Sequence, residues 1–100
     1  MYHLIVCYGH PHDPAAFDEH YSAIHRALAD KIPGVRSWHA GKCGAPDGSK
    51  PPYYLVAVLS FDSQQALDNG LASPEGQAAA ADVENFATGG ATMIVTDDWI

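Results

Sequence analysis

Two stretches of the chain are apolar on both faces of an extended backbone. The segment Tyr2–Tyr8 reads YHLIVCY and residues 53–61 read YYLVAVLSF, and both are rich in the aromatic and β-branched residues that favour strands. Side chains alternate between the two faces of a strand, so a strand with few polar positions on either face is covered on both. We therefore predict that these two strands lie in the middle of a sheet whose two faces are both buried.

A helix is predicted over residues 14–30, and a histidine lies at the edge of its apolar stripe. The dipeptide Asp13-Pro14 supplies an N-cap and a proline at the first helical position. His25 follows Tyr21 by four residues, so the two rings are neighbours on adjacent turns. An imidazole titrates near neutral pH, and in this position it can exchange a proton with a bound molecule. The stripe consists of Phe17, Tyr21, Ile24 and Leu28.

The remaining elements follow from turn and cap signals. Residues 35–42 form a less apolar strand, predicted nearer a sheet edge, and the proline-rich residues 43–52 form the loop that joins it to the next strand. Helices are predicted over residues 64–71 and 74–86, each preceded by a serine cap. A last strand covers residues 91–96. The order of elements is therefore βαββαβ.

This order predicts an α+β fold of the ferredoxin-like type. Its packing is a four-stranded antiparallel sheet with both helices on one face, in which the first and third strands are central. A chain of 100 residues has room for one such domain, over residues 1–100. Helices on one face leave the other apolar face uncovered, and the simplest cover is a second copy of the chain. We therefore predict a homodimer with sheet packed against sheet.

Composition excludes several classes of partner. A net charge of −7 with five basic residues opposes binding to nucleic acid or to an anionic membrane surface. No apolar run approaches the ~20 residues of a membrane span, and the N-terminus has no basic region of a signal peptide. Cys7 and Cys43 lack any paired motif and are interpreted as free thiols. A cytoplasmic location is expected.

The sequence predicts no cofactor and no metal. His10, His12 and Asp13 form a compact group that resembles a set of metal ligands, with His20 in a position to approach it. That loop carries two prolines, however, and its aspartate caps a helix, so a polar surface loop is the better interpretation. No glycine-rich phosphate loop follows the first strand. We expect a protein that binds neither haem, flavin nor structural metal.

Three segments carry a resemblance to a known family. They read FDEHYSAIHRALADKIPG, PYYLVAVLSFDS and SPEGQAAAADVENFATGG, and in this order and spacing the chain resembles the EthD family, named for ethyl tert-butyl ether degradation. The resemblance implies a dimeric α+β barrel and an association with oxidative degradation of ethers and other organic compounds. Ala27 stands where the family usually has a proline, so the helix is expected to continue smoothly past His25.

Two functions of different class remain open. The first is a cofactor-independent oxygenase, oxidoreductase or isomerase that acts on an apolar organic acid or phenol, with His25 as acid/base and Tyr21 as its partner. The second is a non-catalytic accessory protein that holds a hydrophobic intermediate for a partner oxygenase. A second ionisable group that converges on His25 in a closed pocket would favour the enzyme. The aromatic residues predicted to line the ligand pocket are Phe17, Trp38, Tyr54 and Phe86.

Each of these assignments has a structural alternative. His25 could be a partly buried histidine that is satisfied by a carbonyl or by tyrosine, and aromatic residues at such positions commonly belong to a core. His3 and His39 lie on predicted strands, and they are better interpreted as strand residues near an interface than as pocket residues.

Overall fold

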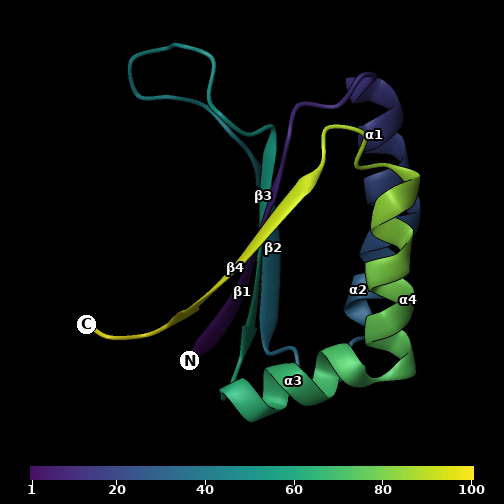
Figure 1. The fold of residues 1–100 in the computed structure, drawn as a ribbon, viewed down its shortest axis with the longest axis vertical. Coiled ribbons are helices and arrows are strands. Elements are labelled where there is room, and N and C mark those ends of the chain that lie inside the picture. Colours follow the sequence, from purple (N-terminus) through teal and green to yellow (C-terminus); the bar gives the residue numbers. More distant parts are fainter.

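The sheet has the predicted topology. The computed structural model describes all residues from 1 to 100, and its four strands are β1 (Tyr2–Tyr8), β2 (Ser37–Lys42), β3 (Leu55–Phe61) and β4 (Ala91–Asp97). They pair antiparallel in the order β2-β3-β1-β4, which places the two most apolar strands in the centre. The helical segments over residues 14–30 and 74–85 lie on one side of this sheet, and the helix over residues 64–72 runs crosswise past the end of the strands (Figure 1). The ferredoxin-like prediction is confirmed.

Local signals set the helix boundaries. The side chains of Asp13, Ser63 and Ser73 each accept a hydrogen bond from a backbone N–H three residues later, which is the geometry of an N-cap. None of these helices is both long enough and apolar enough to span a membrane. The helical elements are α1 (Pro14–His20), η1 (Tyr21–His25), α2 (Arg26–Asp30), α3 (Gln64–Ala72), α4 (Pro74–Asp82) and η2 (Val83–Asn85).

The first helical segment is continuous past His25 but contains a π turn. Elements α1, η1 and α2 follow one another without a break, and the N–H of Arg26 donates to the carbonyl oxygen of Tyr21, five residues earlier. This wider turn was not predicted from the sequence. Single π turns inside α-helices occur frequently at functional sites, and this one spans both residues of the predicted site.

The predicted apolar stripe is wrong at Ile24, because of the π turn. Ile24, expected on the buried face, is 48% exposed, whereas His25 is only 6% exposed and Ala29 only 4%. A π turn holds one residue more than an α turn, so the next buried residue after Tyr21 comes four positions later instead of three. That residue is His25 and not Ile24. The imidazole therefore lies in the buried face itself and not at its edge.

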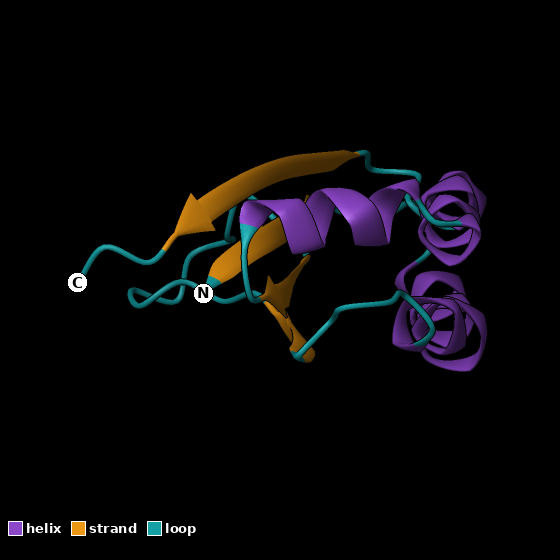
Figure 2. Ribbon diagram, turned by 90° about the horizontal axis from the view of Figure 1, so that it is seen from below, coloured by secondary structure: helices purple, strands orange, loops and turns teal.

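The core lies between the sheet and the helices. Leu4, Val6 and Tyr8 of β1 are buried beneath the helices, and they alternate with Ile5 and Cys7, which point to the opposite face and stay half-buried. Figure 2 shows α1 and α4 nearly end-on at one side of the sheet and α3 running from them across the strands, while the C-terminal tail extends away from α1 and α4. The two central strands thus present apolar side chains on the outer face of the sheet, and these are only partly covered within one chain.

Candidate active site

An apolar cavity of about 120 Å³ lies between the sheet and the helices, and His25 forms part of its wall. The sheet contributes Val6 and Leu59, while helix α4 contributes Ala79. Two phenols and an indole share the lining with these aliphatic side chains, namely those of Tyr8, Tyr21 and Trp38. The cavity can therefore accept a small, mostly apolar molecule and bring it against an imidazole.

The His25 ring is oriented by a carboxylate from the other end of the chain. Its Nδ1 atom lies 3.0 Å from Oδ2 of Asp82, and both residues are buried. An ionised carboxylate can only accept a hydrogen bond, so Nδ1 carries the proton and donates it. This leaves Nε2 as the basic nitrogen, with a lone pair and no hydrogen-bond partner within the chain.

Asp82 is held by two further donors. His20 Nε2 lies 2.8 Å from Oδ1, and the side-chain amide of Asn85 donates to the same oxygen at 3.0 Å. Burial raises the pKa of the Asp82 carboxyl, but the hydrogen bonds from Asn85, His20 and His25 outweigh it, and the net pKa is lowered. The carboxylate is therefore ionised at neutral pH although it is only 6% exposed.

Burial also shifts the pKa values of the groups that face the cavity. It lowers the pKa of His25, and the nearby Asp82 offsets that effect only in part. The imidazole is thus neutral at pH 7 and available as a base. Burial raises the pKa of Tyr21 to about 12 and raises the pKa of Tyr8 further, with Tyr21 and Asp82 adding to the effect at Tyr8. Both phenols remain protonated and can act as hydrogen-bond donors.

Aromatic rings surround the imidazole. The centroid of the Tyr21 ring lies 5.2 Å from that of His25, and the Phe86 centroid lies 4.8 Å from it. Phe17 stacks on Tyr21 at 5.7 Å in the core. Of the four aromatic residues predicted to line a pocket, Trp38 lines the cavity. Phe17, Tyr54 and Phe86 lie behind or beside its wall.

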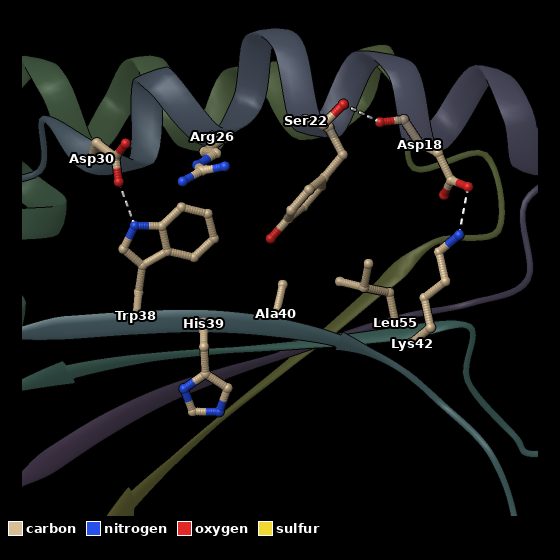
Figure 3. Close-up of a pocket in the computed structure, with 10 residues that line it drawn as sticks. Asp18, Ser22, Arg26, Asp30, Trp38, His39, Ala40, Lys42 and Leu55 are labelled. Carbon is tan, nitrogen blue, oxygen red and sulfur yellow. Dashed lines mark hydrogen bonds and ion pairs between the residues drawn. The ribbon is translucent and has the colours of Figure 1, made fainter.

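A polar groove of about 680 Å³ runs beside the cavity, between the first helical segment and β2 (Figure 3). Lys42 pairs with Asp18, whose other oxygen accepts from the Tyr54 hydroxyl at 2.7 Å. Trp38 Nε1 donates to Asp30 at 2.5 Å. The groove therefore joins a helix to an edge strand through side-chain hydrogen bonds, and it opens to solvent.

The other predicted polar residues do not line the apolar cavity. His10 Nε2 bonds the carbonyl oxygen of Pro51 at 2.8 Å, and His20 bonds Asp82 instead of joining the His10 loop. His39 borders the groove, but its ring points away from the helix, on the far side of β2 (Figure 3). His3 lies on that outer face as well, between Ser60 and Asp98. No group of three such side chains is arranged to hold a metal ion.

The partners of His25 on the second helix were not predicted from the sequence, although one signal was present. Ala79, Asp82 and Phe86 recur at intervals of three and four residues, and all three are buried. A lone aspartate on the apolar stripe of an alanine-rich helix requires donors, because an unpaired buried charge is very costly. That requirement points to a histidine on a facing element.

The comparisons with known proteins agree with this fold. The model of the EthD domain matches residues 10–90. An uncharacterised 11.0 kDa protein from the thcB–thcC intergenic region of Rhodococcus erythropolis is 53% identical over 98% of this chain and 95% of its own length.

Solved structures extend the comparison. An ethyl tert-butyl ether d (EthD) family protein from Bacillus halodurans is 33% identical over 99% of both chains, with a TM-score of 0.92. A dimeric ferredoxin-like protein of unknown function from Jannaschia shares the fold, with 20% identity, a TM-score of 0.73 and coverage of 97% of this chain and 98% of its own. The match to the domain model and the similarity to the protein from Bacillus halodurans show that the chain belongs to the EthD family.

Proposed function

We propose that the protein binds a small organic molecule in the apolar cavity and that His25 exchanges a proton with it. The observation that carries this proposal is the buried hydrogen bond of 3.0 Å between His25 Nδ1 and Asp82, on a ring that lines the cavity. A second ionisable group that converges on the histidine is expected for an acid/base catalyst, whereas an accessory protein has no need of one.

The chemistry is proton abstraction. The lone pair of His25 Nε2 takes a proton from an acidic C–H or from a phenol O–H, and the electron pair of the broken bond stays on the ligand. The imidazolium that forms keeps its Nδ1 proton and donates a hydrogen bond through it to Asp82, whose negative charge stabilises the cation. A positioned base of this kind contributes roughly 10²–10⁴-fold to a rate. Tyr21 and Tyr8 can donate hydrogen bonds to the oxygen of a ligand anion.

The fate of that anion distinguishes two reaction classes. Return of the proton to another atom of the ligand is an isomerisation. Combination of the ligand anion with dioxygen, in which the electron pair of the anion ends in a new bond from the ligand to oxygen and O2 is reduced to a ligand peroxide, begins a cofactor-independent oxygenation. Membership of the EthD family supports the second class, because the family name refers to the degradation of an ether. We place the protein in oxidative degradation of organic compounds on this basis.

The proposal includes a homodimer in the cytoplasm. The outer face of the sheet is apolar and half-covered, and the similar protein from Jannaschia is described as dimeric. A second copy on that face would leave the cavity accessible, because the cavity lies on the helix side of the sheet. Cys7 and Cys43 are free thiols, which suits a reducing compartment.

The test has two stages. Native mass spectrometry of the purified protein identifies a co-purified ligand, and its binding and turnover are then measured from pH 5 to pH 8 for wild type and His25→Gln. We expect the variant to keep its fold and to lose the pH dependence of turnover. Its binding of the anionic form of the ligand should be weaker by about 1.5–3 kcal/mol.

His12→Gln is the matched control, since His12 is exposed in a loop and its side chain makes no hydrogen bond. Superimposable curves for wild type and His25→Gln would make His25 a structural residue. A ligand that binds but is never converted would then favour the accessory function.

A further inference from the structure

The polar groove and the apolar cavity meet at two side chains. Tyr21 and Trp38 line both spaces, so a molecule that lies in the groove can extend past these rings toward His25. The groove opens to solvent and carries the charged side chains of Asp18, Arg26, Asp30 and Lys42, whereas almost all of the cavity lining is apolar. A ligand that fills both therefore has a polar end and an apolar end.

The charges in the groove leave one cation without a partner. Asp18 pairs with Lys42, whereas Asp30 keeps its negative charge and accepts a hydrogen bond from the Trp38 indole. Arg26 forms no ion pair and no side-chain hydrogen bond, and it is exposed. Its guanidinium lies close beneath the helix, on the side that faces β2 (Figure 3), and lines the groove. The guanidinium is thus free to bind an anion from solution.

The π turn sets this arrangement. His25 closes the turn on the cavity side, and Arg26 is the next residue in the chain, on the groove side. Its backbone N–H completes the turn by donating to the Tyr21 carbonyl. Consecutive residues thus present a base to the cavity and a cation to the groove.

We propose that the groove is the subsite for a carboxylate of the ligand and that Arg26 is the residue that selects it. The ligand is then an amphipathic organic acid whose apolar part passes Tyr21 and Trp38 into the cavity. This inference rests on the proposed function, because it names the ligand of the same site. A chain of net charge −7 repels free carboxylates, so selection of one requires a local cation. The planar guanidinium pairs with a carboxylate through two parallel hydrogen bonds.

The experiment compares two probes of the same shape. Phenylacetate carries the carboxylate, and phenylacetamide replaces it with a neutral amide. Binding is followed by tryptophan fluorescence in a Trp99→Phe background, where Trp38 at the junction is the only remaining tryptophan. The variants are Arg26→Gln, Arg26→Lys and, as a matched loss of one positive charge outside the groove, Lys50→Gln, which alters an exposed loop residue.

We expect phenylacetate to bind more tightly than phenylacetamide, and Arg26→Gln to weaken phenylacetate binding by about tenfold or more. Phenylacetamide binding should be unchanged in all variants. Arg26→Lys should retain part of the preference for the acid, and Lys50→Gln all of it.

The remaining outcomes separate this inference from the proposed function. Equal binding of both probes, unaffected by Arg26→Gln, would overturn the carboxylate subsite and leave ligand binding in the cavity intact. Absence of binding for both probes would overturn the cavity as a ligand site and the subsite with it. Binding of phenylacetate that depends on Arg26, with a pH profile unchanged by His25→Gln, would retain the subsite and reject His25 as the base.

Discussion

His25 and Asp82 are 57 residues apart in the chain, yet Nδ1 of the one lies 3.0 Å from Oδ2 of the other inside the helix layer. The contact joins the end of the π turn to the last residue of α4. It sets the tautomer of the imidazole. It also places a negative charge beside the ring, and this charge stabilises the imidazolium that forms when the ring takes a proton. Asp82 is therefore a positioning residue that acts through His25.

Replacement of Asp82 by asparagine should separate these roles. The amide keeps the shape but loses the charge, so the Nδ1–H tautomer of His25 is no longer enforced and the pKa of His25 falls further. Nitrogen NMR of the imidazole should report mixed tautomers. We expect the free energy of unfolding to fall by about 1–3 kcal/mol, because buried donors lose a charged acceptor.

Asp68→Asn is the matched control for that variant, since Asp68 is exposed on α3 and pairs with nothing. It should leave both the stability and the NMR signals of His25 unchanged. An Asp82→Asn protein with a wild-type tautomer would contradict the positioning role.

The stability of the protein should fall in mild acid. Because burial lowers the pKa of His25 in the folded state, the unfolded chain binds the proton more readily, and folding loses free energy as the pH falls below about 6.5. A histidine pKa that is one unit lower in the folded than in the unfolded chain corresponds to about 1.4 kcal/mol of stability lost when the imidazole must be protonated. Urea unfolding between pH 7 and pH 5 should show a shallower dependence for His25→Gln than for wild type. Parallel curves for the two proteins would contradict the burial effect.

A homodimer should form through the outer face of the sheet. Sedimentation at micromolar concentration should show a species of twice the chain mass, because a half-covered apolar sheet of this kind is stabilised by burial of ~800 Å² per partner. Val58→Lys introduces a charge on that face, where Val58 is half-buried, and should give monomers. Gln65→Lys, on the exposed surface of α3, should leave the dimer intact. A wild-type protein that sediments as a monomer would contradict the predicted dimeric α+β barrel.

The purified protein should be colourless and free of tightly bound metal. His20 and His25 both bond Asp82, while His10 and His3 bond Pro51 and Ser60 in other parts of the structure, and no three such side chains are arranged to hold a metal ion. An absorption spectrum and elemental analysis decide the question. A stoichiometric Soret band, or one transition metal per chain, would mean that the His20–Asp82–His25 cluster or the His10 loop serves as a ligand set.

Close backbone contact should make Gly9 intolerant of a side chain. A Cβ atom at this position would lie 2.2 Å from the carbonyl oxygen of Gly89, where the loop after β1 meets the loop before β4. We expect Gly9→Ala to lower the free energy of unfolding by roughly 1–3 kcal/mol through backbone displacement. Gly41→Ala is the control, since its Cβ would meet nothing within 4 Å. Equal stability of the two variants would show that the two loops move apart freely.

Local patterns determined the elements of this protein. Alternation along Tyr2–Tyr8 predicted a central strand, and the caps at Asp13, Ser63 and Ser73 marked the starts of helices correctly. These signals act over a few residues, so they can be recognised without knowledge of the fold. The βαββαβ order then left few ways to pack the sheet.

The tertiary structure decided what surrounds His25. The π turn buries the imidazole and exposes Ile24, a choice that depends on packing against the sheet and α4 and not on helix propensity. The carboxylate on His25 comes from Asp82, a pairing that only the packing of two distant helices creates. Likewise, the sequence pattern made Trp38 and Phe86 equivalent pocket candidates, whereas the register of β2 places only the indole in the cavity wall. Contacts over long sequence separations depend on how whole elements pack, and no local pattern encodes them.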